Sequence, residues 1–384
     1  MMSILLPLPS GRLERLEFAD PARLEVRSTP PVDRVVYAAS HVVADPLRSS
    51  SSGPAAIDWD ATLSLRHGIW QTGLSVAESM DTAQRGMGLD AEQAMELAAR
   101  TLAEDPRAGA GVVVGTSSDA LLDETATLQQ IEDAYLRQIA FVCERGGTPV
   151  LMASRHLARA ARGRNDYLRV YRRLIAESDA PVILHWLGDV FDPALTGYWG
   201  STDAAEALET VLELIAENVD AVRGIKISLL APEYEIALRQ RIVAGPIVFT
   251  GDDFHYTDLI AGDGTHHSHA LLGAFAALAP WASAALARLD AGDEDGFRRI
   301  LEPTQALSRV IFRSPTPAYK TGIAWLSYLT GRQTHFRMLG GRESARDLLH
   351  LSELVRAANA IGYFDDPDLT TERLAAVLRV HGIV

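Results

Sequence analysis

The pattern of hydrophobic and polar positions changes twice along the chain. Residues 1–33 combine short apolar pieces with five prolines, which predicts a small β-hairpin or an extended N-terminal segment. From Arg34 onward, short apolar runs alternate with longer segments of helical period, and after Pro280 only helical periods remain. An alternation of this kind is typical of repeated βα units, so we expect an α/β fold with helices at its C-terminal end.

Eight of the short apolar runs are candidate strands. Several of them do not alternate between apolar and polar residues, as expected for parallel strands covered on both faces. Eight parallel strands are the number that closes a (β/α)8 TIM barrel. The predicted strands are residues 35–40, 74–78, 111–116, 149–154, 181–186, 222–228, 247–250 and 271–275.

Helix signals complete this prediction. Three pairs match the capping-box pattern, in which a capping residue is followed three positions later by an acid or amide: Asp90 with Gln93, Thr127 with Gln130, and Asp203 with Glu206. The serine run at 49–52 predicts a flexible loop after the first strand. Beyond Pro280, helices are expected at residues 282–289, 295–312, 318–330, 344–361 and 370–381. The predicted domains are an N-terminal β extension over 1–33, a (β/α)8 barrel over 34–290 and a C-terminal helical region over 291–384.

Composition narrows the classes of function. The 384 residues include 36 Lys and Arg against 50 Asp and Glu, a net charge of −14 that argues against nucleic acid or an anionic membrane as partner. The single cysteine, Cys143, excludes a disulfide framework and a cysteine-based zinc site. No apolar run has the length of a membrane span, and the N-terminal residues lack the pattern of a signal peptide. We therefore expect a cytoplasmic protein that acts on a small molecule.

The most informative single residue is Lys226, within the apolar stretch 221–230. A lysine on a buried strand loses hydration, which lowers the pKa of its amine and makes the amine a better nucleophile. The sequence therefore points to a Schiff-base lysine on the inner face of the barrel. The alternative is a lysine near a strand end that extends its amine into solvent.

Polar residues gather where the predicted strands end, which is where the active sites of such barrels lie. For some of these residues, a purely structural role is the alternative to a role in the active site. His185 follows an apolar run that is typical of a core histidine, and one of the aspartates after the seventh strand suits a helix N-cap. The histidines before the eighth strand suit either a metal site or a polar loop. The candidates from the second, fifth, sixth and seventh strands and from the loop into the eighth are Glu78, Ser79, Asp81, Thr82, His185, Lys226, Ser228, Gly251, Asp252, Asp253, His255, His266, His267 and His269.

Five motifs in order resemble one known superfamily. They are Gly-Ile-Lys at 224–226, Val-Phe-Thr-Gly-Asp-Asp at 248–253, Leu-Leu-Gly-Ala-Phe at 271–275, the proline-containing segment 313–320 and the C-terminal segment 374–384. This set resembles the dihydrodipicolinate synthase and N-acetylneuraminate lyase superfamily of class I aldolases, and within it an uncharacterised dihydrodipicolinate synthase-like branch of unknown function.

The resemblance implies a TIM barrel, an imine-forming role for Lys226 and a backbone contact from Gly251 to a bound oxo acid. It also assigns Leu272 and Gly273, in the eighth-strand motif, to the substrate site. His185 stands where the family has its catalytic tyrosine. The family usually assembles as dimers or dimers of dimers, so a homodimer or homotetramer is expected.

Two departures from the family concern its substrate. Glu78 to Thr82 stands in place of the loop that binds the carboxylate of pyruvate, and the arginine expected shortly after the tyrosine is absent. These departures argue against pyruvate as the donor.

Three hypotheses follow. The first is a carbon–carbon or carbon–oxygen lyase of carbohydrate metabolism that needs no cofactor: Lys226 forms a Schiff base with a 2-oxo acid or sugar-derived carbonyl, His185 transfers the proton, and the other candidates bind substrate. The second is a metal-dependent isomerase or hydrolase with a divalent metal held by His185, Asp253, His255 and His267. The third is a sugar-acid binding protein without catalysis.

Overall fold

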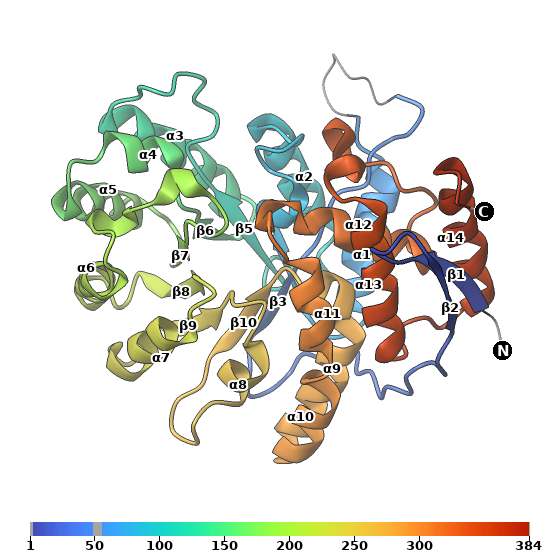
Figure 1. Cartoon of the computed structure of the whole chain (residues 1–384). Coiled ribbons are helices and arrows are strands. Elements are labelled where there is room, and N and C mark those ends of the chain that lie inside the picture. The colour runs from blue at the N-terminus through green and yellow to red at the C-terminus, as the bar shows by residue number, and fades with distance from the viewer. Residues whose placement is uncertain (1–2, 49–55, 384) are drawn as a thin grey trace.

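Eight parallel strands close into a barrel in the order β10-β3-β4-β5-β6-β7-β8-β9 (Figure 1). The structure is a computed structural model that describes residues 3–48 and 56–383, so the serine run at 49–52 lies outside the described residues. The strands are β3 (Val36–Ala39), β4 (Ser75–Glu78), β5 (Val112–Thr116), β6 (Thr148–Leu151), β7 (Val182–Leu187), β8 (Val222–Ser228), β9 (Ile247–Thr250) and β10 (His269–Leu272). The predicted (β/α)8 barrel is thereby confirmed.

The last strand is displaced from its predicted range. β10 ends at Leu272, and Phe275 already begins helix α9 (Phe275–Asp290). The apolar run continues without a break from the strand into this buried helix. A continuous apolar run does not show where one element ends and the next begins, which explains the error.

Alternate residues of each strand face the barrel interior. Ile183 and Phe249 belong to the cluster that fills the interior, whereas Ile225 and Ile227 pack outward against the helices. Because side chains alternate along a strand, Lys226 between these two isoleucines faces inward. The strand pattern therefore places its amine inside the barrel.

Helices cover the outside of the barrel between the strands (Figure 1). The capping boxes at Asp90 and Thr127 are confirmed. The third is wrong: Asp203 caps the Ala205 amide, while the Glu206 carboxylate accepts a hydrogen bond from Ser201. The helices are α1 (Trp59–Trp70), α2 (Ala91–Glu104), α3 (Leu128–Cys143), α4 (Arg155–Ala160), α5 (Arg164–Ala176), α6 (Ala204–Glu217), α7 (Pro232–Arg241) and α8 (Tyr256–Ala261), with 3-10 turns η1 (Asp81–Ala83), η2 (Pro193–Leu195) and η3 (Tyr198–Gly200).

The C-terminal region is helical, as expected. The predicted helix 295–312 is two helices, because Pro303 interrupts it. The elements after α9 are α10 (Glu294–Leu301), α11 (Thr304–Ile311), η4 (Thr316–Ala318), α12 (Tyr319–Leu329), η5 (Leu339–Ala345), α13 (Leu348–Ala360) and α14 (Pro367–Val380).

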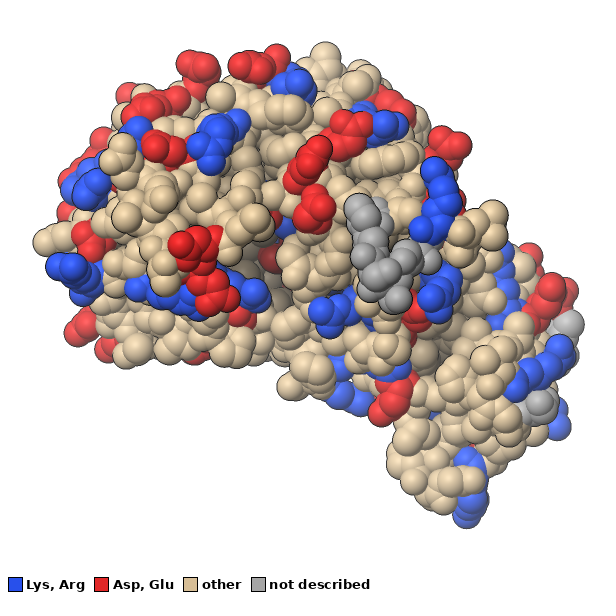
Figure 2. All heavy atoms as spheres, turned by 90° about the horizontal axis from the view of Figure 1, so that it is seen from above, with Lys and Arg blue, Asp and Glu red and all other residues tan. Residues whose placement is uncertain are grey.

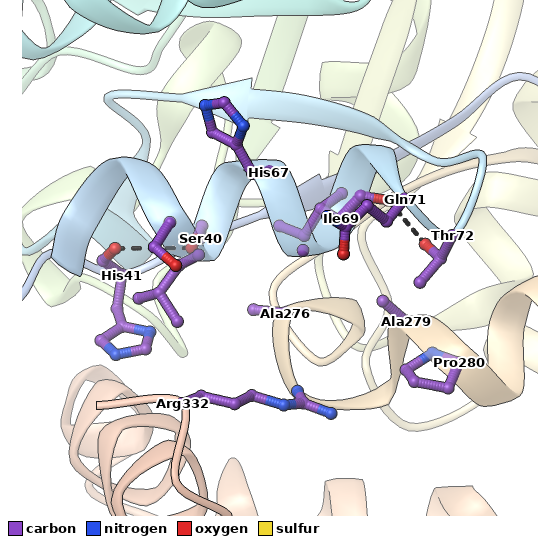
Figure 3. Close-up of a pocket in the computed structure, with 13 residues that line it drawn as sticks. Ser40, His41, His67, Ile69, Gln71, Thr72, Ala276, Ala279, Pro280 and Arg332 are labelled. Atoms are coloured by element: carbon purple, nitrogen blue, oxygen red, sulfur yellow. Dashed lines mark hydrogen bonds between the residues drawn. The ribbon is translucent and has the colours of Figure 1, made fainter. Parts of the chain in front are cut away.

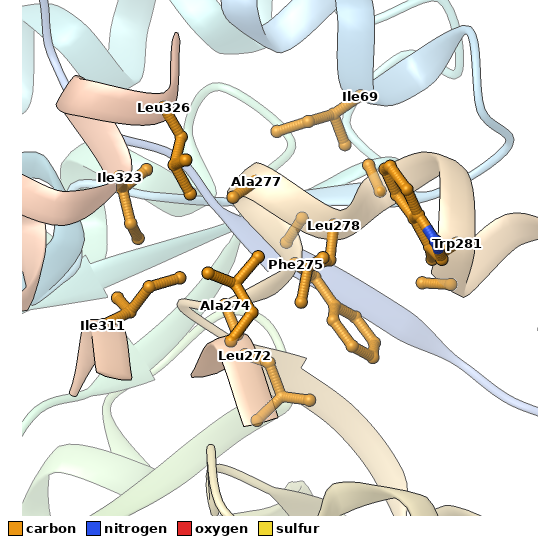
Figure 4. Packing of buried hydrophobic residues seen from close by; sticks show 14 of the residues in the cluster. Ile69, Leu272, Ala274, Phe275, Ala277, Leu278, Trp281, Ile311, Ile323 and Leu326 are labelled. Atoms are coloured by element: carbon orange, nitrogen blue, oxygen red, sulfur yellow. The ribbon is translucent and has the colours of Figure 1, made fainter. Parts of the chain in front are cut away.

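One hydrophobic cluster joins the barrel to these helices. Figure 4 shows Leu272 of β10 and Phe275 of α9 in the same cluster as Ile311 of α11 and Ile323 of α12. Burying this apolar surface fixes the end of α11 and the start of α12 relative to β10. Phe312 and Tyr319, which flank the turn between those helices, are held against the barrel in this way.

The N-terminal extension is the predicted hairpin, formed by β1 (Ser3–Pro7) and β2 (Leu13–Glu17) in antiparallel pairing. It lies beside α13 (Figure 1), where Arg356 pairs with Glu14 and the Asn359 side chain donates to the Glu17 carbonyl. The hairpin therefore contacts the C-terminal helical region, and the division into three domains stays a prediction.

The surface carries charges of both signs. On the face seen in Figure 2, Lys and Arg are interspersed with Asp and Glu, and no single sign dominates a broad area. Within the described ranges, no helix has both the length and the apolar character needed to cross a bilayer.

Candidate active site

Lys226 lies in the middle of β8, paired in register with His185 of β7 and Phe249 of β9. Its side chain is 8% exposed, and burial lowers the pKa of its amine, an effect that Asp81 and Asp253 oppose. Among the described residues the amine makes no hydrogen bond or ion pair. Burial favours the neutral amine, and the neutral amine is the form whose lone pair attacks a carbonyl carbon.

A small cavity lies above this lysine at the carboxyl end of the barrel. Its volume is about 20 Å³, enough for roughly one water molecule. It adjoins a cleft of about 450 Å³, a size that suits a small ligand, and Asp81, Leu187, Phe191 and Tyr319 line both spaces. The cavity residues are Met80, Asp81, Thr82, Leu187, Phe191, Lys226, Ser228, Asp253, Gly273, Phe312 and Tyr319.

Asp253 supplies an acid–base group to the cavity. Burial raises the pKa of its carboxyl to about 7, although the Ala274 amide and the Lys226 amine both favour the ionised form. The Ala274 amide donates to Oδ1 at 2.9 Å, and the Ser308 hydroxyl donates to the Asp253 carbonyl at 2.6 Å. The carboxyl is thus fixed in place and titrates near neutrality, as a group that exchanges protons with substrate requires.

A pair of hydroxyls forms another wall. Thr82 Oγ1 and the Tyr319 hydroxyl are 2.8 Å apart, and the Tyr319 ring stacks on Phe312 with centroids 4.3 Å apart. Burial holds the pKa of Tyr319 well above its usual range, and Asp81 and Asp253 add to this. The phenol therefore stays protonated and serves as a hydrogen-bond donor.

Two glycines leave room around these groups. A Cβ at Gly251 would lie 2.2 Å from Ser228 Oγ and 2.7 Å from Lys226 Cε. A Cβ at Gly273 would lie 3.2 Å from Thr82 Oγ1 and 3.2 Å from the Tyr319 ring. The absence of side chains at both positions lets the lysine and the hydroxyl pair reach the cavity.

His185 does not border the cavity. Its Nε2 is 3.2 Å from Ser228 Oγ, Nδ1 has no hydrogen-bond partner among the described residues, and the ring is fully buried. Burial, with the Lys226 charge, holds the pKa of this histidine well below its usual range. A neutral imidazole here contacts the cavity only through Ser228, so Asp253 is better placed than His185 to move protons.

Glu78 and Ser79 face away from the cavity, contrary to the sequence prediction. Glu78 forms a fully buried ion pair with Arg66 (Nε–Oε2 2.8 Å) and accepts from Thr101, while the Ser79 hydroxyl donates to the Ala94 carbonyl in α2. Because Ala77 faces the barrel interior, its neighbour Glu78 must point outward to the helices.

Three further candidates also lie outside the cavity. Asp252 accepts hydrogen bonds from the Phe254 and His255 amides and pairs with His255 Nδ1 at 2.9 Å. It is therefore the turn-capping member of the aspartate pair, and His255 is turned toward it. Leu272 packs in the hydrophobic cluster outside the barrel wall.

The histidines before the eighth strand lie at the opposite end of the barrel. His269 begins β10, and its Nδ1 accepts a hydrogen bond from the Val35 amide, just before β3. A loop that enters a strand lies at the amino end of the sheet, so the expectation that His266, His267 and His269 join the active-site end is wrong. His267 therefore does not meet His185, Asp253 and His255, and no group of three or more metal-ligating side chains is assembled in residues 3–48 and 56–383.

A second cavity, of about 360 Å³, lies outside the barrel between α1 and α9 (Figure 3). His41 and Arg332 border it, and the His41 ring is held by Gln333, with Nε2 and Oε1 2.7 Å apart. Burial lowers the pKa of His41 to about 4. The lining contains no carboxylate and no amine, so this cavity lacks the groups that the lysine cavity combines.

Sequence reasoning missed the C-terminal contribution to the site. Phe312 and Tyr319 come from the ends of α11 and α12, beyond the last strand. The one available signal was the segment 313–320, whose resemblance to the superfamily marks the turn that carries Tyr319 and Lys320.

Solved structures with the same architecture come from the dihydrodipicolinate synthases. The enzyme from Aquifex aeolicus superimposes with a TM-score of 0.62 at 13% identity, covering 85% of this chain and 97% of that one. The enzyme from Oceanobacillus iheyensis gives 0.63 at 15% identity, covering 85% and 97%. The enzyme from Cyanidioschyzon merolae with lysine bound gives 0.63 at 15% identity, covering 86% and 100%. At these identities the likeness shows the fold.

At the level of sequence, the family model described as "Protein of unknown function (DUF993)" matches residues 4–383. The chain belongs to that family. No curated protein matches it by sequence.

Proposed function

We propose that this member of the DUF993 family is a Schiff-base-forming lyase or aldolase that acts on a 2-oxo acid or sugar-derived carbonyl compound through Lys226. The observation that carries the proposal is a buried, unpartnered lysine that faces a cavity together with a carboxyl whose pKa is raised to about 7. The barrel of the dihydrodipicolinate synthases supports it as an analogy of fold.

The proposed reaction begins when the Lys226 amine adds to the substrate carbonyl and water leaves, which forms a protonated imine. In a carbon–carbon lyase, this cation accepts the electron pair of the Cα–Cβ bond as that bond breaks, which leaves an enamine. In a carbon–oxygen lyase, it accepts the pair of the α C–H bond, and the oxygen then leaves the next carbon with the pair of its own bond. Ionised Asp253 accepts the proton that the substrate releases and returns it to the enamine carbon or to the leaving oxygen. Water then hydrolyses the remaining imine, which releases the product and restores the Lys226 amine. The Thr82–Tyr319 hydroxyl pair donates a hydrogen bond to the substrate oxygen as it becomes negative.

The chemistry needs no cofactor, because the imine itself is the electron sink. The proposal also includes a cytoplasmic homodimer or homotetramer in carbohydrate metabolism. Light scattering of the purified protein measures the oligomeric state.

Borohydride trapping tests the proposal. The chain contains only two lysines, Lys226 and Lys320, against 34 arginines, so a reduced adduct is assigned to one lysine by peptide mass alone. We expect an adduct on the peptide that carries Lys226 with at least one member of a panel of 2-oxo acids, hydroxyaldehydes and ketoses. The absence of an adduct on Lys226 across the panel contradicts the proposal, as does equal labelling of Lys226→Met.

A further inference from the structure

The second of the two lysines lines the same site. Lys320 is the second residue of α12, directly after Tyr319, and its side chain is 5% exposed. Tyr319 borders both the small cavity above Lys226 and the wider cleft next to it, and Lys320 borders the cleft. The two lysines of the chain thus line two adjoining spaces, which share four wall residues.

The Lys320 amine lacks a carboxylate partner. Its Nζ contacts the Pro317 carbonyl at 3.3 Å and the Met87 sulfur at 3.5 Å, and it lies 4.5 Å from the centre of the Tyr319 ring. In the described part of the chain, no carboxylate oxygen lies within ion-pair distance of this amine. A buried cation without an anion is costly, and a bound anion reduces that cost.

A second cation stands beside it. Arg342 borders the same cleft, and its carbonyl accepts a hydrogen bond from Thr321 at the start of α12, at 2.9 Å. Its guanidinium makes no hydrogen bond or ion pair within residues 3–48 and 56–383. The pKa of Lys320 is lowered to about 8, mainly by burial; the Asp81 charge opposes this, and the Arg342 charge adds a smaller lowering.

The other cations of the cleft are already neutralised. Arg85 forms an ion pair with Asp119 at 2.6 Å, and Arg155 forms one with Asp192 at 2.5 Å. Among the described residues, Lys320 and Arg342 are therefore the lysine and arginine of the cleft lining that form no ion pair, and the Asp81 charge acts on Lys320 from beyond ion-pair distance. Asp81, between the two lysines, repels an anion placed next to the carbonyl and suits a substrate hydroxyl.

We propose that Lys320 and Arg342 form a subsite for an anionic group, carboxylate or phosphoryl, at the end of the substrate remote from its carbonyl carbon. The assignment of the carbonyl end rests on the proposed imine chemistry at Lys226. The substrate class is then a hydroxy-carbonyl compound with its negative charge at the far end. An ammonium and a guanidinium together recognise such a group through charge-assisted hydrogen bonds.

The first test does not depend on catalysis. Acetic anhydride acetylates accessible lysine amines, and mass spectrometry reports the extent at Lys320 separately from Lys226. Inorganic phosphate and malonate are added as the two anion probes, and we expect at least one of them to reduce acetylation of Lys320 fivefold or more. Protection by phosphate alone assigns a phosphoryl group, and protection by malonate alone assigns a carboxylate. If neither anion protects Lys320, the subsite is wrong.

The second test measures the preference for charged aldehydes during borohydride trapping on Lys226. The pairs are glyceraldehyde with glyceraldehyde 3-phosphate, and butanal with succinic semialdehyde. We expect the charged member of one pair to be trapped at least tenfold more efficiently, and this preference to fall near one in Lys320→Met and in Arg342→Gln. The loss of trapping should be larger for the charged member than for the neutral member of each pair, which ties the effect to anion binding.

Arg337→Gln is the matched control. Arg337 is an exposed arginine that pairs with Glu343, it lies just before η5, the turn that carries Arg342, and it does not line the cleft. Arg342 is itself exposed, so Arg342→Gln keeps the test valid if Lys320→Met fails to fold. A preference that survives in Arg342→Gln overturns the subsite. If Lys226 takes no adduct from any carbonyl, the imine proposal fails while the acetylation result still decides whether the anion subsite exists.

Discussion

Two clusters of titratable side chains in this molecule each combine a buried carboxyl with a basic group, and they differ in their surroundings. The lysine cluster comprises Asp81, Lys226, Asp253 and Tyr319 at the carboxyl end of the barrel. The histidine cluster comprises Glu235, Arg239, His267 and His269 around the amino end of β10, where the Ser268 hydroxyl joins Glu235 and Arg239. Each contains a buried carboxyl with a raised pKa, about 7 for Asp253 and about 8 for Glu235.

The difference between the clusters lies in access to a ligand. The lysine cluster borders a cavity and a cleft, and the Lys226 amine makes no hydrogen bond or ion pair with the described residues. In the histidine cluster, Ser268 donates to Glu235, and Arg239 donates to the Leu259 carbonyl at 3.0 Å. A shifted pKa marks a functional site only when the group also faces space that a substrate enters, so a raised pKa alone does not distinguish the two carboxyls.

The sharpest contrast is expected from removing one residue of each cluster. Lys226→Met should lower the yield of borohydride-trapped adduct at least a thousandfold, because no other amine lies in the small cavity. His267→Ala should leave the yield within twofold, because His267 lies at the opposite end of the barrel. Peptide mass spectrometry after trapping measures both. A comparable loss in His267→Ala would show that the two ends cooperate and would remove the contrast.

The two carboxyls should separate almost as clearly. Asp253→Asn should reduce turnover of the trapped carbonyl substrate by about 10²–10⁴-fold, the usual contribution of a general acid–base group. In the wild-type protein, kcat/KM should rise with pH through about 7, because the ionised carboxyl accepts the proton. This rise should be absent in Asp253→Asn and unchanged in Glu235→Gln. If the rise of kcat/KM with pH also disappears in Glu235→Gln, Glu235 takes part in the mechanism.

A smaller effect is expected at the hydroxyl pair. Tyr319→Phe removes the hydroxyl that lies 2.8 Å from Thr82 Oγ1, and should lower kcat about tenfold through the loss of one hydrogen bond to the substrate oxygen. Tyr363→Phe is the control, since Tyr363 is a buried tyrosine whose hydroxyl donates to the Ala277 carbonyl away from the site. Equal losses of kcat in the two variants would assign Tyr319 to packing alone.

The fold was predictable because each of its signals is local. Apolar runs marked the strands, and the capping residues Asp90 and Thr127 marked helix starts that the structure retains. Lys226 was identified for the same reason. Side chains alternate along a strand, so the apolar neighbours of a charged residue in a buried strand show which face of the sheet it occupies. The break at Pro303 carries an equally local signal, which the predicted helix at 295–312 overlooked.

The site was less predictable because it depends on the face of the strand and the end of the barrel that each side chain occupies, and on which residues lie close in space. Glu78 lies at a strand end, as the prediction required. Because side chains alternate along the strand and Ala77 faces inward, Glu78 points outward to Arg66. His267 was assigned to the wrong end because it precedes its strand. Tyr319 comes from a helix beyond the barrel, and only tertiary packing of the C-terminal helices brings it to Lys226.

Stability against pH is where the two clusters should behave alike. A carboxyl whose pKa is raised on folding stabilises the folded chain fully below its unfolded pKa, near 4, and this contribution is lost as pH rises through the folded value. The contribution of Asp253 is therefore lost between pH 4 and about 7, and that of Glu235 is lost between pH 4 and about 8. Asp253→Asn and Glu235→Gln remove the ionisation, so both variants should gain stability relative to wild type between pH 5 and pH 9.

The midpoint of urea unfolding at pH 5 and at pH 9 measures this gain, and the expected difference is of the order of a few kcal/mol for each variant. The matched control is Asp366→Asn, because the Asp366 side chain caps the Leu369 amide at an exposed helix start and its effect should not grow with pH above 5. If only Glu235→Gln gains stability at high pH, Asp253 is already ionised in the folded protein. The Lys226 charge would then outweigh the burial of its neighbour, and the proton acceptor of the site would be ready without a change in pH.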